Sequence, residues 1–108
     1  MDRTITQLPN GGELHEYSDG EKYYYLHHNY HREDGCAVEL INGTRYWYIN
    51  GQLHRTDGPA IDCLNGNKYW YVDGVQLYCK NQEQFERLMK LKVFWYNLRF
   101  EDSTECVK

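Results

Sequence analysis

Short aromatic and β-branched runs alternate along this chain with pairs of small polar residues. The run Arg45–Ile49 (RYWYI) is typical of a pleated, half-buried strand. Asn42-Gly43 precedes it and Asn50-Gly51 follows it, and Asn-Gly is a strong hairpin signal. The pattern predicts a strand between two turns.

A second, less regular run follows in the same stretch of chain. Ala60–Leu64 leads into Asn65-Gly66, and Asp57-Gly58-Pro59 ahead of it requires a tight turn. Strands joined by such short turns pair antiparallel. The runs therefore predict a mainly β fold, an antiparallel β-meander of about six to eight strands with roughly one hairpin per unit.

The sequence repeats with an offset of 23 residues. Residues 23–45 align on residues 46–68 without a gap. We divide the chain, a single domain over 1–108, into a half unit (12–22), two full units (23–45 and 46–68), a truncated unit (69–80) and a C-terminal segment (81–100). The identical columns are Tyr23/Tyr46, Tyr25/Tyr48, His31/His54, Arg32/Arg55, Asp34/Asp57, Gly35/Gly58, Ala37/Ala60, Asn42/Asn65 and Gly43/Gly66.

The C-terminal segment changes to helical spacing. Asn81 is a good N-cap, and Gln84 stands at the third helical position of a capping box. The apolar spacing predicts a helix over Gln82–Lys92, with either an extension to Tyr96 or a last strand over Val93–Tyr96. We expect this helix to cap apolar sheet surface that a meander cannot bury by itself.

Composition narrows the class of protein. The 108 residues are 41% hydrophobic and carry a formal net charge of −4, which suits one folded domain and argues against direct nucleic-acid binding. No apolar run approaches the roughly 18 residues of a membrane span, so we expect a soluble cytoplasmic protein with no membrane contact. The four cysteines, at positions 36, 63, 79 and 106, form no C-x-x-C pair, and we expect free, buried or half-buried thiols.

The repeated His-Arg-x-Asp segments, His31–Asp34 and His54–Asp57, invite an enzymatic interpretation. We expect a scaffold role instead, because residues that recur once per unit are typical of structure. An Asp before Gly bonds its own turn, and an Arg stacks on a neighbouring ring. A metal site at His27, His28 and His31 is disfavoured, since adjacent strand residues point to opposite faces. We therefore expect no enzyme, no metal and no cofactor.

The unit resembles a known family. The pattern aromatic-Trp-Tyr-x-Asn-Gly-x-Leu-His-Arg-x-Asp-Gly-Pro-Ala, complete in Tyr46–Ala60, resembles the tandem repeats of small proteins from tailed bacteriophages and some giant viruses, distant relatives of the MORN repeat. Tyr23–Ala37 departs from it at His27-His28 and at Cys36. The resemblance runs from about Gly12 to Phe85 and implies a viral source and a helix-capped meander.

Two aromatic columns carry the candidate binding surface, Tyr24/Trp47/Trp70 on one face and Tyr25/Tyr48/Tyr71 on the other. Either one column is core and the other is partly covered, or an exposed ladder forms a platform for a partner. The predicted binding residues are Trp47, Trp70, Tyr24, Arg32, Arg55, His31 and His54.

The resemblance implies a function as well as a fold. Small phage proteins without catalytic residues commonly block a host enzyme or a defence complex. We therefore expect a non-enzymatic protein-binding module that inhibits a host or bacterial-defence protein in the host cytoplasm, a counter-defence role of the anti-CRISPR type. The alternative is a binder that sequesters a nucleotide or oligosaccharide, with Arg32 and Arg55 as the clamp. The open sheet edges also offer a homodimer contact.

Overall fold

The computed structural model describes residues 2–91. These residues fall in two compact units, Met1–Tyr78 and Cys79–Lys108. The described part of the second unit contains one helix, α1 (Gln82–Lys90). The strands of the first unit are β1 (Arg3–Gln7), β2 (Glu13–Tyr17), β3 (Lys22–Leu26), β4 (Asn29–Tyr30), β5 (Val38–Glu39), β6 (Arg45–Tyr46), β7 (Tyr48–Ile49), β8 (Gln52–Leu53), β9 (Ile61–Asp62), β10 (Lys68–Val72) and β11 (Val75–Leu77).

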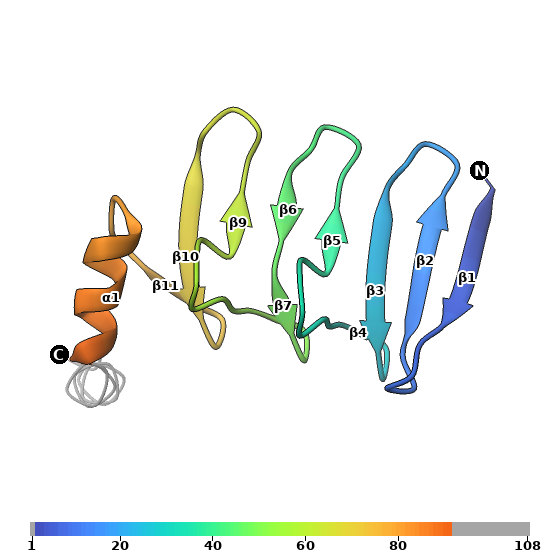
Figure 1. Ribbon diagram of the computed structural model, residues 1–108, viewed down its shortest axis with the longest axis horizontal. Coiled ribbons are helices and arrows are strands. Elements are labelled where there is room, and N and C mark those ends of the chain that lie inside the picture. Colours follow the sequence, from blue (N-terminus) through green and yellow to red (C-terminus); the bar gives the residue numbers. More distant parts are fainter. Residues whose placement is uncertain (1, 92–108) are drawn as a thin grey trace, which may run out of the picture. The chain divides into compact units, whose positions relative to one another are not determined.

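Nine of the eleven strands in the described residues form one antiparallel sheet (Figure 1). The order is β1-β2-β3-β5-β6-β9-β10-β11, β4 pairs with β3, and β7 and β8 form a separate two-stranded ribbon. This arrangement confirms the predicted fold class, a mainly β antiparallel meander followed by a C-terminal helix. The sheet has nine strands where six to eight were expected, because long predicted runs divide into shorter strands.

The run Arg45–Ile49 shows why the strands divide. It splits at Trp47 into β6, which pairs with β5 and β9, and β7, which pairs only with β8. The Trp47 N–H donates to the Ala60 carbonyl at 2.8 Å, and its carbonyl accepts from the His54 N–H at 3.0 Å. The chain therefore changes its pairing partner at Trp47. The strand propensities of the residues cannot predict this change.

One kind of turn closes the hairpins at one end of the sheet and also joins β1 to β2. In each, a glycine with φ between 88° and 102° donates its N–H to the carbonyl three residues earlier. The Asn or Asp before that glycine accepts the N–H two residues later through its side chain, at 2.7–3.0 Å. These Asx-Gly pairs are Asn10-Gly11, Asp19-Gly20, Asn42-Gly43 and Asn65-Gly66.

Two-residue turns close the other ends of three hairpins. Asn50-Gly51 has φ values of 52° and 82°, and Asp73-Gly74 has 51° and 80°. Positive φ at both residues is the signature of a type I′ turn, which suits the twist of paired strands. The prediction of a hairpin at Asn50-Gly51 is confirmed.

Only a few side chains of the described residues are fully buried, as a single layer of short strands requires. Aromatic side chains make further ring contacts between neighbouring strands. The buried apolar side chains are Ala37, Val38, Ala60, Trp70, Val72, Leu77 and Phe85.

The helix of the second unit begins where its sequence predicts. Asn81 is the N-cap, and its side-chain oxygen accepts from the Gln84 N–H at 2.9 Å. The Gln84 side chain accepts in return from the Lys80 N–H at 2.8 Å, one residue before the cap. The helix ends at Lys90, two residues before the predicted end. The alternatives for Val93–Tyr96 concern residues outside the described range.

Candidate interaction surface

The Arg of each His-Arg-x-Asp segment contacts an aromatic ring, an Asp carboxylate and a backbone carbonyl. We call this set of contacts the clasp. The Arg55 guanidinium carbon lies 3.7 Å from the centre of the Trp47 ring. Its Nε donates to Asp57 Oδ1 at 2.8 Å, and its Nη1 donates to the Pro59 carbonyl at 3.0 Å. One side chain thus joins strand, loop and turn, through a cation–π contact and two charge-assisted hydrogen bonds.

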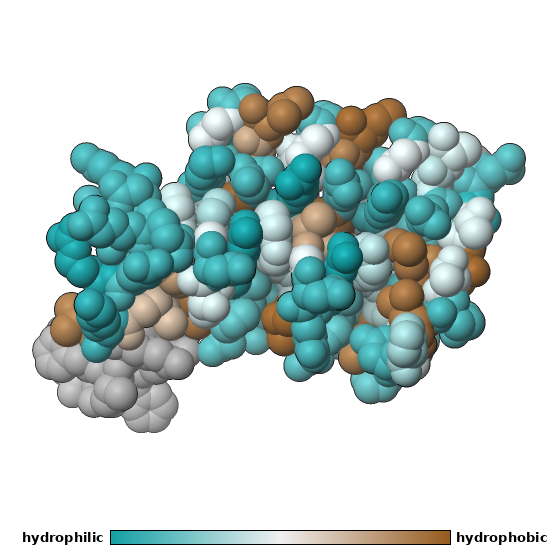
Figure 2. Space-filling model, in the orientation of Figure 1, coloured by the Kyte–Doolittle hydropathy of each residue, from teal (hydrophilic) through white to brown (hydrophobic). Residues whose placement is uncertain are grey.

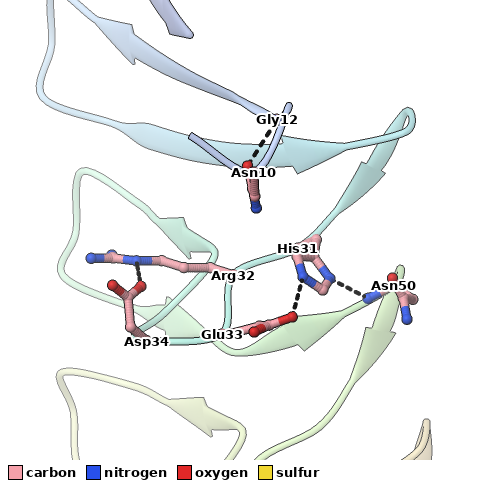
Figure 3. Close-up of polar contacts among 7 residues, drawn as sticks. All are labelled: Asn10, Gly12, His31, Arg32, Glu33, Asp34 and Asn50. Atoms are coloured by element: carbon pink, nitrogen blue, oxygen red, sulfur yellow. Dashed lines mark hydrogen bonds and ion pairs between the residues drawn. The ribbon is translucent and has the colours of Figure 1, made fainter. Parts of the chain in front are cut away.

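The same clasp occurs one unit earlier. The guanidinium of Arg32 lies 4.1 Å from the Tyr24 ring centre and donates to Asp34 at 2.8 Å and to the Cys36 carbonyl at 3.2 Å (Figure 3 shows the Arg32–Asp34 pair). The contact at Cys36 uses only the backbone carbonyl. Replacing the Pro of the motif by Cys therefore leaves the clasp intact.

The glycine that follows each Asp makes room for the clasp. A Cβ added at Gly58 would lie 2.6 Å from the Arg55 guanidinium carbon, and one at Gly35 would lie 2.9 Å from that of Arg32. Both distances are far inside van der Waals contact. The guanidinium lies between an aromatic ring and a glycine, which explains Gly at this position without any need for positive φ.

The histidines of the motif join consecutive hairpins. His31 Nδ1 accepts from the Asn50 N–H at 2.9 Å, and its Nε2 lies 3.3 Å from a Glu33 carboxylate oxygen (Figure 3). One unit later, His54 Nδ1 accepts from the Asp73 N–H at 3.0 Å. In both units a ring nitrogen of the histidine thus receives a backbone N–H of the next hairpin. In the later unit the same nitrogen, His54 Nδ1, also lies 3.2 Å from Asp73 Oδ1.

The carboxylates of the clasps are held in their charged form. The Arg55 hydrogen bond lowers the pKa of Asp57, and the Arg32 hydrogen bond lowers that of Asp34, below the ordinary value of 3.8. Both Asp side chains are at least 85% exposed. The segment is therefore a set of ion pairs and backbone contacts at the surface, in which each Asp side chain bonds to the Arg side chain.

The predicted binding residues form two separate clusters and one buried ring. Tyr24, His31 and Arg32 belong to one cluster, and Trp47, His54 and Arg55 belong to the other. In both, the guanidinium lies over the aromatic ring. Trp70 in β10 is only 3% exposed. The rings of the Tyr24/Trp47/Trp70 column thus make contacts within the protein.

The opposite face of the sheet carries a continuous group of tyrosines that we call the tyrosine face. Its rings are half-buried and touch one another in sequence, with centroid distances from 5.1 to 6.3 Å. Tyr30 stands at the centre, next to Tyr23, Tyr25 and Tyr48. The members are Tyr17, Tyr23, Tyr25, Tyr30, Tyr46 and Tyr48.

The tyrosine face contains a hollow of about 310 Å³. Aromatic rings form most of its lining, and two aliphatic side chains complete it. The residues around it are Tyr23, Tyr30, Val38, Leu40, Tyr46 and Tyr48.

Three phenols of this face have a raised pKa. Burial, together with the Glu21 carboxylate that accepts a hydrogen bond from the Tyr23 hydroxyl at 2.9 Å, raises the pKa of Tyr23 to about 12. Burial likewise raises the pKa of Tyr25 and of Tyr48. These three side chains therefore offer neutral rings with hydroxyl groups.

Sequence reasoning found part of this face. Tyr25 and Tyr48 belong to a predicted column, whereas Tyr17 and Tyr30 do not recur at the 23-residue offset, where Leu40 and Leu53 stand. Tyr30 joins the group because β4 turns back onto β3 and places it opposite Tyr25. The pairing of β4 with β3 determines the position of Tyr30, and the 23-residue repeat does not reveal it.

Exposed aliphatic side chains mark two of the Asx-Gly turns. Figure 2 shows hydrophobic surface at the loops that join β5 to β6 and β9 to β10. Ile41 and Leu64 in these loops are 66% and 79% exposed. Isolated exposed side chains of this kind are common on soluble proteins and carry no site by themselves.

Residues 2–91 contain neither a cluster of metal-ligating side chains nor a membrane-spanning helix. Across residues 2–91, no group of three or more His, Cys, Asp or Glu side chains is placed to hold a metal ion. No helix in that range is long and apolar enough to cross a membrane. Cys36 and Cys63 are half-buried thiols, and burial raises the pKa of Cys36. Cys106 lies outside the described range.

Comparisons with known proteins give no match. No protein-family model matches the sequence, and neither a curated protein nor a solved structure matches it significantly. Functional inference therefore starts from the geometry of this chain.

Proposed function

We propose that this protein is a non-enzymatic binding module that presents its tyrosine face to another protein. The observation that supports the proposal is the continuous group of half-buried tyrosine rings on one side of the sheet. Tyrosine combines a large contact area with a polar hydroxyl and few rotatable bonds, and it is enriched at protein interfaces.

The other aromatic face fits this role less well. Tyr24 and Trp47 already carry a guanidinium over their rings, and each guanidinium is held by a carboxylate and a carbonyl. A ligand that stacked on either ring in place of the guanidinium would have to displace these contacts. The hollow of about 530 Å³ beside Tyr24, His31 and Arg32 is bordered in part by the charged side chains of Glu33 and Asp34. We therefore place the proposed binding surface on the tyrosines rather than on the Trp and Arg residues of the sequence prediction.

The hollow in the tyrosine face provides a place for an anchoring side chain. Its volume of about 310 Å³ is at the lower end of ligand pockets, enough for one aromatic or aliphatic group. Val38, only 4% exposed, and Leu40 add apolar contact. An apolar side chain inserted among tyrosine rings, with hydroxyl groups around it, matches the usual arrangement of an interface hot spot.

The resemblance to phage repeat proteins supports a particular kind of partner. We propose a host or bacterial-defence protein, which this protein would bind stoichiometrically and inhibit, in a counter-defence role of the anti-CRISPR type. Support for this step comes only from the resemblance of the repeat pattern, complete in Tyr46–Ala60, and the tyrosine face supports only the binding role.

Affinity capture tests the proposal. Tagged wild-type protein, Tyr48→Ala and Tyr78→Ala are each exposed to bacterial lysate, and captured proteins are identified by mass spectrometry. Tyr78 is 84% exposed and is not a member of the tyrosine face, so its variant controls for loss of a surface tyrosine. We expect one dominant partner, at least about tenfold depleted with Tyr48→Ala, which is 1.4 kcal/mol of binding energy, and unchanged with Tyr78→Ala.

Two results would count against a protein partner. One is equal capture by wild type and Tyr48→Ala, with circular dichroism showing that both are folded. The other is a blank capture with a nucleotide or oligosaccharide retained by the purified protein in native mass spectrometry. The second result would favour the ligand-sequestering alternative.

A further inference from the structure

The strand β1 lies at one edge of the sheet (Figure 1). It has five residues, all of them exposed, and it pairs with β2 along its whole length. Among residues 2–91, no strand pairs with its outer side. An open edge of this length can pair with a further strand unless a side chain or an irregularity blocks it.

Hydrogen bonds at the two ends of β1 show which backbone groups face outward. The Asp2 carbonyl accepts from the Ser18 N–H at 3.0 Å, and the Leu8 N–H donates to the Gly12 carbonyl at 2.9 Å. In an antiparallel pair, successive residues direct their N–H and C=O groups to opposite sides. Even-numbered residues of β1 therefore bond to β2, and odd-numbered residues direct their backbone groups outward.

The outward-facing residues are Arg3, Ile5 and Gln7, and their side chains leave the edge clear. The Arg3 guanidinium donates to the Tyr17 hydroxyl at 3.4 Å and lies 5.9 Å from that ring centre. The Gln7 amide donates to Glu13 at 3.4 Å. Both polar side chains thus reach back across β2. β1 contains no proline and no lysine, two residue types that often prevent an edge strand from pairing with another chain.

We propose that β1 pairs antiparallel with β1 of a second copy of this chain, about a two-fold axis at Ile5. In this register Ile5 faces Ile5 of the second copy, Arg3 faces Gln7, and Thr4 faces Thr6. The pairs at Arg3, Ile5 and Gln7 each exchange two backbone hydrogen bonds, because all three residues present both groups outward.

The register is self-complementary. It places no like charges opposite each other, and it pairs β-branched residues in the middle of the strand, where they favour pairing. In a parallel arrangement the two Arg3 side chains would lie close together. Pro9 has no N–H, so the ladder ends after Gln7. A second copy of the chain fits this edge through its own sequence.

Sedimentation velocity over a concentration series tests the dimer. We expect wild type to shift from monomer to dimer with increasing concentration, and Ile5→Val to behave alike, since it keeps the N–H and the strand propensity. Ile5→Pro removes an outward N–H and leaves the bonds of the even-numbered residues to β2 in place. We expect it to weaken dimerisation by at least tenfold. A wild type that stays monomeric throughout, or a folded Ile5→Pro that dimerises like wild type, would overturn the proposal.

Hydrogen exchange supplies a test that needs no substitution. The amides of Thr4 and Thr6 bond to β2 and should be protected at every concentration. Those of Ile5 and Gln7 should gain protection only as the concentration rises. Concentration-dependent protection elsewhere, with none at Ile5, would place any dimer contact on another surface and contradict this register.

Discussion

At the scale of single residues, the repeated His-Arg-x-Asp-Gly motif is a set of mutually dependent contacts. Arg55 needs the Trp47 ring on one side and a residue without Cβ on the other. The Asp57 carboxylate then fixes the guanidinium in the plane of that gap. Each motif position is explained by a contact within the protein, so its recurrence needs no catalytic explanation.

The clasp gives a prediction for Gly58→Ala. The new methyl group would meet the guanidinium of Arg55 and displace it from the Trp47 ring, so we expect a loss of about 1 kcal/mol in the free energy of unfolding, the size of a partly exposed cation–π contact. Urea denaturation measures it. In an Arg55→Ala background the same change should cost much less, because the clash is gone. An equal cost in both backgrounds would show that the glycine acts through its backbone.

Tyr23 gives a prediction at high pH. Its pKa in the folded protein is raised from 10.0 to about 12 by burial and by Glu21. The stabilisation from this phenol is therefore complete below pH 10 and is lost as the pH rises towards 12. Ultraviolet titration of phenolate absorbance should show a late phase, to which Tyr25 and Tyr48 also contribute, and Tyr23→Phe should reduce its amplitude by one phenol. A late phase of unchanged amplitude in Tyr23→Phe would assign it to the other tyrosines.

At the scale of elements, the hairpins repeat but one of them lacks glycine. His27 and His28 have φ values of 51° and 69° at the turn between β3 and β4, where the later units have Asn50-Gly51 and Asp73-Gly74. An L-residue other than Gly, Asn or Asp is strained in this region by about 1–2 kcal/mol. The first unit thus keeps the turn at a cost in stability.

This hairpin gives a prediction for His28→Gly. Removing the Cβ at φ 69° relieves the strain, and we expect the free energy of unfolding to rise by about 1 kcal/mol. Thermal or urea denaturation measures the change. Gly51→Ala, at φ 82° in the next unit, is the reciprocal control and should lower stability. A less stable His28→Gly would mean that the imidazole makes a contact worth more than the strain.

Most of these strands and turns could be predicted from the sequence, but fewer of the pairings between strands could. Asn50-Gly51 identifies its turn by itself, because positive φ at both residues restricts the choice of residue type. The break at Trp47 depends on Ala60 and His54, which lie later in the chain. Which aromatic face stays open was likewise unpredictable, since it depends on loops folding back to place Arg32 and Arg55 over Tyr24 and Trp47.

At the scale of the whole sheet, histidines connect one hairpin to the next. The bond from the Asn50 N–H to His31 and that from the Asp73 N–H to His54 each join residues 19 apart. The side chain of His31 is 3% exposed and that of His54 is 27% exposed. The same bond is thus shielded from water in one unit and partly hydrated in the next.

This difference predicts an order of effects for two substitutions. His31→Ala leaves the Asn50 N–H without its acceptor in a buried setting, and we expect a loss of about 1–3 kcal/mol in the free energy of unfolding. His54→Ala should cost less, because water can replace the ring nitrogen. Urea denaturation of both variants measures the order, with circular dichroism as a check on the fold. A larger loss for His54→Ala would mean that contacts other than this bond decide the outcome.

The contacts that join hairpins have a consequence for how such a chain could evolve. Excising residues 46–68 would bring Arg45 to Tyr69 and leave Asp73 at the place of Asn50, opposite His31. The histidine bond and the backbone bonds at the new junction would be of kinds that already exist in the parent. Unequal recombination could therefore shorten or lengthen the gene in steps of 23 codons while the product still folds. Under the proposed binding function, the area offered to a target would then change by whole increments, and selection could match it to targets of different size.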